Sequence, residues 1–262
     1  MLMPRWMWKA VVVFALGAVS LCAQGRGGRG AQPVRTPKEG APVDLTGYWV
    51  SVVTGDWRFR MITPPKGDFT AMPLNAEARK IANAWDPAKD EAAGEQCKSY
   101  GAPALMRVPG RLHITWVDEE TLKLEMDSGQ QTRIFYFGTP KSQGSDWQGV
   151  SKASWEFMPG TITSTDGARA SLGSVDGRAG SLKVVTTNFK AGYLRKNGVP
   201  YSKDALVTEY FNIHHDPYGA DWMIVTTIVH DPTYLTVDYI TSTNFKKEPD
   251  DSKWRPRPCS LQ

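Results

Sequence analysis

The chain has 262 residues, of which 41% are hydrophobic and 22% charged, so it is long enough to bury the core of one sizeable domain. Its 31 basic and 27 acidic residues give a net charge of +4, and loss of residues 1–23 would remove two basic residues and leave +2. A charge this close to balance excludes the strongly basic surface with which proteins bind nucleic acid.

The first residues have the composition of a secretory signal peptide. Arg5 and Lys9 precede an apolar run from Ala10 to Leu21, and small or polar residues follow Ala23. Such a run is shorter than a membrane span, so we predict a signal peptide at residues 1–23 and a periplasmic or secreted protein without a transmembrane segment after cleavage. The alternative is an uncleaved N-terminal membrane anchor.

Two further regions follow the signal peptide. Residues 24–43 are rich in Gly, Arg, Pro and Gln and hold almost no large apolar residue, which predicts a disordered linker. Residues 44–262 are expected to form a single domain.

The cysteines agree with export. Cys22 lies in the predicted signal peptide, which leaves Cys97 and Cys259 as one pair. An oxidising compartment would join them in a disulfide, and the alternative is two free buried thiols. The chain has no Cys-x-x-Cys pair, so neither a redox motif nor a cysteine zinc site is predicted.

Most of the remaining chain has the composition of β-strands, rich in Val, Ile, Thr and aromatic residues and separated by turn-forming residues. Strands are predicted near residues 47–53, 57–62, 111–117, 121–126, 131–137, 151–158, 181–188, 205–215, 222–230 and 234–245. The last three are joined by short Asp-Pro connectors and form an antiparallel meander. Residues 88–103 and 161–180 are read as loops.

One segment predicts a helix. From Leu74 to Trp85 the apolar residues recur at helical spacing, Asn75 is a good N-cap, and Asp86-Pro87 ends the segment. About ten strands against one short helix predict an all-β fold, an antiparallel meander closed into a barrel of about 8–10 strands whose end or edge the helix seals. A β-sandwich is the alternative.

The start of the domain resembles a known family. Gly47-x-Trp49 opens the first strand, as in the lipocalins and other calycins, in which the Trp plugs the closed end of a β-barrel. This resemblance implies a calycin-like barrel that binds a small molecule in its interior.

Three longer segments resemble blocks of a family of exported bacterial proteins with no assigned activity. They are residues 57–67, 193–201 and 226–236. This resemblance implies export and the domain boundaries, and it implies no site. Residues 193–201 also hold an Asn-Gly turn between basic and aromatic residues, which is either a plain hairpin or the rim of a pocket.

Glu209 is the first candidate catalytic residue. It shares a strand face with Val207 and Phe211, and a carboxylate inside an apolar barrel would have a raised pKa and could act as general acid or base, with Tyr136, Tyr210 or Tyr239 as hydrogen-bond partner. The alternative is that this face packs outside on the helix and that Glu209 pairs with Arg133 or Arg58.

His230 is the second candidate base, in the part of the chain where the histidines cluster. It could hold a first-row metal with Glu209 or Asp231, or be a plain polar residue at a strand end. We predict no metal site and no cofactor.

Tryptophans are the candidate ligand-binding residues, because the indole is common in pockets for flat apolar molecules. The candidates are Trp57, Trp116, Trp147, Trp155 and Trp222. The alternative is that they belong to the core or plug a barrel end.

Three functional hypotheses follow. The first is an exported binding protein that holds a small apolar molecule inside the barrel. The second is a periplasmic enzyme of the same fold with isomerase, hydratase or cyclase chemistry, using Glu209 or His230 as base and Tyr210 beside it. The third is a surface module that recognises carbohydrate or protein through exposed tryptophan.

Overall fold

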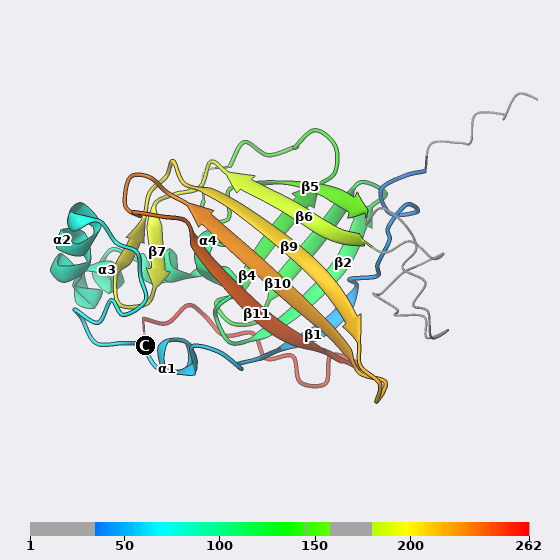
Figure 1. The fold of residues 1–262 in the computed structure, drawn as a ribbon, viewed down its shortest axis with the longest axis horizontal. Coiled ribbons are helices and arrows are strands. Elements are labelled where there is room, and N and C mark those ends of the chain that lie inside the picture. Colours follow the sequence, from blue (N-terminus) through cyan, green and yellow to red (C-terminus); the bar gives the residue numbers. More distant parts are fainter. Residues whose placement is uncertain (1–34, 145, 158–179, 262) are drawn as a thin grey trace, which may run out of the picture. The chain divides into compact units, whose positions relative to one another are not determined.

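The computed structural model describes residues 35–144, 146–157 and 180–261, and nine of the eleven strands in this part of the chain close into a barrel (Figure 1). The barrel order is β1-β11-β10-β9-β6-β5-β4-β3-β2, and β7 and β8 form a separate hairpin. The strands are β1 Gly47–Val52, β2 Arg111–Asp118, β3 Thr121–Met126, β4 Gln131–Tyr136, β5 Val150–Phe157, β6 Gly180–Thr187, β7 Gly192–Arg195, β8 Val199–Tyr201, β9 Leu206–His215, β10 Asp221–His230 and β11 Tyr239–Glu248. The all-β barrel prediction is confirmed.

β1 closes the barrel, because it pairs with β2 on one side and β11 on the other. Trp49 of β1 lies opposite Leu112 and Lys247, is fully buried, and donates its indole N–H to the Leu45 carbonyl at 2.9 Å. Gly47 has a φ of +100°, which L side chains rarely adopt, so the Gly-x-Trp segment needs glycine there. A closed nine-stranded barrel with this start is compatible with a calycin-like fold.

One neighbouring pair departs from the all-antiparallel expectation. β5 pairs with β4 in parallel, with Phe135 opposite Ser151. The connection between the two strands runs back along the barrel, since Gln148 donates to the side chain of Gln131 at the start of β4. The chain therefore enters β5 from the same end as β4.

The final meander is confirmed, with a later start for its third strand. β9, β10 and β11 pair antiparallel in sequence, and β11 begins at Tyr239 instead of Tyr234. Asp231 causes the delay, because its carbonyl accepts the backbone N–H groups of Tyr234 and Leu235 and its carboxylate accepts that of Thr233. These bonds form a turn where the strand was expected.

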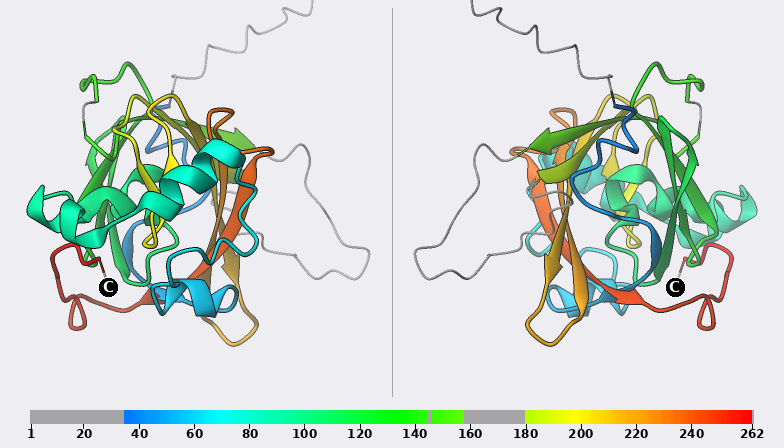
Figure 2. Two further views of the ribbon diagram at one scale, coloured as in Figure 1. Left: turned by 90° about the vertical axis from the view of Figure 1, so that its left-hand side faces the viewer. Right: turned by 90° about the vertical axis from the view of Figure 1, so that its right-hand side faces the viewer.

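Helices cover one end of the barrel, which we call the helical end (Figure 2). The predicted helix is α2, Ala76–Ala84, and Asn75 caps it by accepting the Ala78 N–H at 2.9 Å. Its buried Ala78 and Ala82 belong to the apolar cluster that also holds Val207 and Val229 of the barrel strands, and α2 contacts β8, so the helix helps to seal this end as expected. Short helices α3 Pro87–Ala92, η1 Gln96–Tyr100 and α4 Ala102–Leu105 occupy much of the stretch read as a loop.

The predicted strand at residues 57–62 is wrong, because its first residues form a short helix, α1 Trp57–Arg60. Asp56 adopts a left-handed conformation, and its carbonyl accepts the N–H groups of Phe59 and Arg60. Six residues of mixed apolar and basic type fit either structure, and β1 already has neighbours on both sides. The strand that precedes the segment therefore has no free edge with which the segment could pair.

The C-terminal tail is tied to the helical part of the chain. Cys97 of η1 and Cys259 form the predicted disulfide, with Cα atoms 5.2 Å apart, and the Tyr100 hydroxyl donates to the Ser260 carbonyl. The described residues include no helix of the length and apolarity needed to span a membrane.

The predicted signal peptide, residues 24–34 of the predicted linker and residues 161–179 of the predicted loop lie outside the described residues. Of the predicted linker, residues 35–43 are described. Here Lys38 pairs with Glu119 at 3.0 Å, Val43 is buried, and the Pro37 carbonyl accepts the indole N–H of Trp155. This part of the segment packs on the barrel.

Candidate functional site

The barrel interior contains a polar band between two apolar clusters. At its centre Arg133 of β4 meets Glu209 of β9 through two charge-assisted hydrogen bonds, Nη1 to Oε1 at 2.9 Å and Nη2 to Oε2 at 2.6 Å. Both side chains are 0% exposed. Nη2 also donates to Thr186 at 3.0 Å, and the hydroxyls of Thr186 and Ser151 are 2.8 Å apart. Glu209 therefore points inward, as in the first of the two interpretations, but its partner is Arg133, which belonged to the alternative, and not a tyrosine.

This geometry gives Glu209 a structural role. A carboxylate that is paired with a guanidinium and shielded from solvent has no route to a substrate. The other candidate catalytic residues are not beside it. Tyr210 lies on the outer wall with Lys183 over its ring, and His230 is 57% exposed with its Nδ1 2.7 Å from Asp238. The structure therefore does not assemble the three into one site.

The candidate tryptophans are dispersed. Trp116 and Trp155 lie 6.5 Å apart, and each contacts Phe137 at the end of the barrel opposite the helices. Trp57 is exposed on α1, Trp147 lies under the Lys190 ammonium, and Trp222 donates to Asp216 on the outer wall. Only Trp116 and Trp155 are brought together.

Side chains fill the described part of the lumen between the polar band and that aromatic group. Leu124, Phe135, Val184 and Phe211 are among the interior residues with no exposed surface. Side chains this completely buried do not border a cavity that water could enter. A ligand in this part of the barrel would have to displace them.

A pocket lies at the helical end instead. Its lining comes from residues 59–63, 107–109 and 194–196 together with Ser99 and Ala104, and the pocket is partly open to solvent. Phe59, Leu194 and Val108 contribute apolar surface, while Arg60, Arg107 and Arg195 contribute three guanidinium groups. We call this the arginine pocket.

Arg60 and Arg107 meet at one side of the arginine pocket. Arg60 donates Nε–H to the Arg107 carbonyl at 2.9 Å, and Arg107 pairs with Asp56 at 3.1 Å. Burial and, next, the charge of Arg107 lower the pKa of Arg60 to about 10, although Asp56 opposes this. The Arg60 guanidinium thus lies in surroundings that disfavour its positive charge.

Arg195 of β7 completes the cluster. It is buried, donates to the Thr70 carbonyl at 2.8 Å, and lies over the ring of Phe59 at 4.3 Å. Its pKa is lowered first by burial and also by the charge of Arg107, while Tyr239 raises it. Like Arg60, Arg195 forms no ion pair with a carboxylate among the described residues.

Several buried donors of the arginine pocket have no hydrogen-bond partner in the described part of the chain. They are Arg60 Nη2, Arg195 Nε, Ser99 Oγ and Thr63 Oγ1. A buried donor without a partner costs about 1–3 kcal/mol, and an unpaired cation costs more. An anion in the pocket would offset both costs, so the arrangement is suited to binding one.

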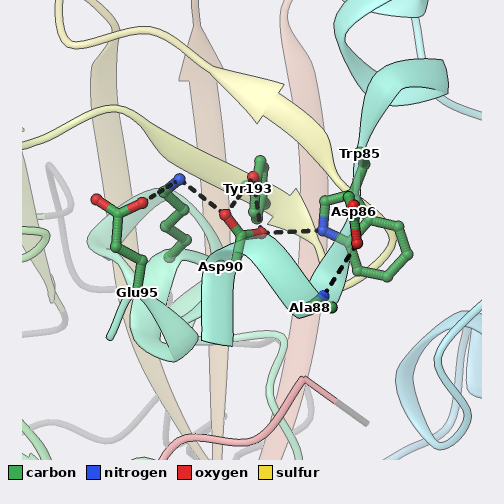
Figure 3. A network of polar contacts seen from close by, with 7 residues as sticks. Trp85, Asp86, Ala88, Asp90, Glu95 and Tyr193 are labelled. Atoms are coloured by element: carbon green, nitrogen blue, oxygen red, sulfur yellow. Dashed lines mark hydrogen bonds and ion pairs between the residues drawn. The ribbon is translucent and has the colours of Figure 1, made fainter. Parts of the chain in front are cut away.

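A network around Asp90 holds the pocket wall in place (Figure 3). Asp90 of α3 accepts the indole N–H of Trp85 at 3.1 Å, the Lys98 ammonium at 2.9 Å and the Tyr193 hydroxyl at 2.9 Å. Lys98 also pairs with Glu95 at 2.5 Å. Through these bonds a single carboxylate fixes η1 and β7, which carry Ser99 and Arg195.

The β7–β8 turn is fixed independently. Gly198 has a φ of +82°, and a Cβ there would lie 2.2 Å from Trp85, so only glycine fits. The Asn197 amide donates to the carbonyls of Pro65 and Asp68, which ties the hairpin to the loop after α1. Both interpretations of residues 193–201 therefore apply, since the hairpin also borders a pocket.

Sequence reasoning did not single out Arg60, Arg107 or Arg195 as site residues. Two of them lie in segments that were set apart, 57–67 and 193–201, which the fold brings together at the helical end. The signal was an arginine directly after an aromatic or apolar residue in each segment, as in Phe59-Arg60 and Leu194-Arg195.

The described residues contain no cluster of three or more His, Cys, Asp or Glu side chains placed to hold a metal ion. Comparison of the chain with protein-family models, with curated proteins and with solved structures finds no match.

Proposed function

We propose that this is an exported binding protein whose ligand is a small molecule with an apolar body and an anionic head, held in the arginine pocket. The observation that carries the proposal is that three largely buried guanidinium groups meet in this pocket. Of the three, only the guanidinium of Arg107 pairs with a carboxylate among the described residues, that of Asp56. Apolar side chains from the same segments would cover the ligand body.

The proposed ligand is still a small, largely apolar molecule, as the sequence predicts, but it carries a negative charge and binds in the arginine pocket and not inside the barrel. The lumen is filled by side chains over its described middle part, while the arginine pocket is open to solvent. The disulfide supports export, because such bonds persist in oxidising compartments. The candidate base Glu209 is buried against Arg133, so it gives the enzyme hypothesis no support.

The test is calorimetric titration with decanoate as the anionic probe and decanol as its neutral counterpart. Decanoate should bind, and decanol should bind much more weakly, because only the carboxylate can satisfy the guanidinium donors. Arg195→Met should weaken decanoate binding roughly tenfold or more, the effect of losing a hydrogen bond between charged groups.

Arg58→Met is the matched control. Arg58 lies on α1 next to Phe59, but it pairs with Asp68 and does not line the pocket. It should leave decanoate binding unchanged. Equal binding of decanol, or equal losses in the two variants, would contradict the proposal. Circular dichroism of each variant checks that it remains folded.

A further inference from the structure

An exposed apolar group lies beside the mouth of the arginine pocket. Trp57 is 63% exposed, Met61 59% and Ile62 64%, and we call these three residues the α1 rim. Met61 and Ile62 also line the pocket. Trp57 and Met61 are four residues apart on one turn of helix, so they lie on the same side of α1.

Basic residues surround the α1 rim. Arg58 and Lys66 are exposed on the same segment, and the three arginines of the pocket lie behind it. Asp68 pairs with Arg58 and Asp56 with Arg107, so acidic groups offset only part of this charge. Large apolar side chains among exposed cations are the combination that binds at the interface of an anionic membrane.

We propose that the α1 rim docks this protein on an anionic lipid surface, so that the arginine pocket opens toward the lipid headgroups and takes its ligand from the membrane. The inference rests on the proposed function of the pocket. Trp57, Met61 and Ile62 would enter the interfacial region, while Arg58 and Lys66 would face the lipid phosphates. Charge complementarity selects a lipid surface over an apolar protein partner.

The experiment measures co-sedimentation of the purified protein with vesicles of phosphatidylcholine, with or without phosphatidylglycerol. The protein should partition to the phosphatidylglycerol vesicles and should release from them as salt is added, since exposed charges are screened. Trp57→Ser, which we call the α1 rim variant, should lower the partition coefficient roughly tenfold, and Trp57 does not line the pocket. Lys66→Ser should lower it about fivefold, the effect of one basic residue at an anionic surface.

Tyr218→Ser is the matched control, because Tyr218 is 96% exposed but lies in the β9–β10 loop at the opposite end of the barrel (Figure 1). It should leave partitioning unchanged. An equal loss in Tyr218→Ser, or no loss in the α1 rim variant, would overturn the inference.

Decanoate titration separates this inference from the function on which it rests. Trp57→Ser should still bind decanoate, because Trp57 does not line the arginine pocket, and Arg195→Met should still partition to vesicles. A parent protein that binds decanoate but ignores phosphatidylglycerol vesicles would overturn membrane docking and leave the binding function standing. A protein that does neither would refute both.

Discussion

Two groups of buried arginine side chains in this protein differ in how their charge is matched. In the barrel, Arg133 faces the Glu209 carboxylate and two hydroxyl groups. At the helical end, Arg60 and Arg195 lie near Arg107 and have no carboxylate of their own among the described residues. The first group is sealed from solvent, and the second lines an open pocket.

The difference indicates that the charge of Arg133 serves the stability of the fold, whereas the charges of Arg60 and Arg195 can serve to bind a ligand. Burying an ion is costly, so a folded chain keeps a buried cation where a partner offsets the cost. Glu209 is that partner inside the barrel. In the arginine pocket the partner is only partly supplied by the chain, and the remaining charge is available to a ligand. The predictions below test each half of this contrast.

The largest effect is expected at the matched pair. Glu209→Gln would leave Arg133 buried without a counter-charge, which should lower the free energy of unfolding by about 3–5 kcal/mol. Urea denaturation of the parent and the variant measures the difference. Combined Arg133→Met and Glu209→Leu substitution should restore most of the loss, because apolar side chains of similar size remove both buried charges. A loss below about 1 kcal/mol in Glu209→Gln would contradict this account.

A much smaller change in the free energy of unfolding is expected when an arginine of the pocket is replaced. Arg60→Met removes a guanidinium whose pKa burial lowers to about 10, and it loses one hydrogen bond to the Arg107 carbonyl. The two effects oppose each other, so without ligand the free energy of unfolding should stay within about 1 kcal/mol of the parent value. Urea denaturation measures this quantity.

Added decanoate should then raise the melting temperature of the parent protein more than that of Arg60→Met, because a ligand stabilises the state that binds it. A loss of several kcal/mol in Arg60→Met without ligand would show that this arginine is as structural as Arg133. The comparison would then fail.

The two groups also differ in how far the sequence predicted them. Side chains alternate along a strand, so Val207, Glu209 and Phe211 could be assigned to one face from local pattern alone, but the pattern left open whether that face points inward. The structure places the face inside the barrel and pairs Glu209 with Arg133, a partner that was considered only for an outward face. The Asn75 cap and the Cys97–Cys259 pair were likewise readable, because a local rule or simple counting fixes each.

The arginine pocket could not be read in this way. Its walls come from three segments far apart in the chain, and their meeting depends on how short helices and a hairpin settle on a barrel end. No periodic pattern encodes that placement. The misassigned strand at residues 57–62 shows the difficulty, since six residues with mixed spacing fit a helix or a strand until their neighbours are known.

The smallest effect concerns the wall that supports the unmatched cluster. Burial, followed by the hydrogen bond to Asp90, raises the pKa of Tyr193 to about 12, against 10.0 for a free tyrosine. A raised folded-state pKa contributes stability that is complete below about pH 10 and is lost as the pH rises toward about 12. The stability difference between the parent and Tyr193→Phe should therefore shrink between about pH 8 and about pH 11.

Urea denaturation of both proteins at the two pH values measures this change. The difference between the two proteins removes the contributions of other groups that titrate at alkaline pH, because both proteins contain them. One such group is Arg60, whose lowered pKa changes the stability in the opposite direction. A difference that stays constant with pH would mean that neither burial nor Asp90 raises the pKa of the Tyr193 hydroxyl. In that case β7 would hold Arg195 in the pocket wall through backbone pairing and apolar packing alone, as the barrel strands hold Arg133.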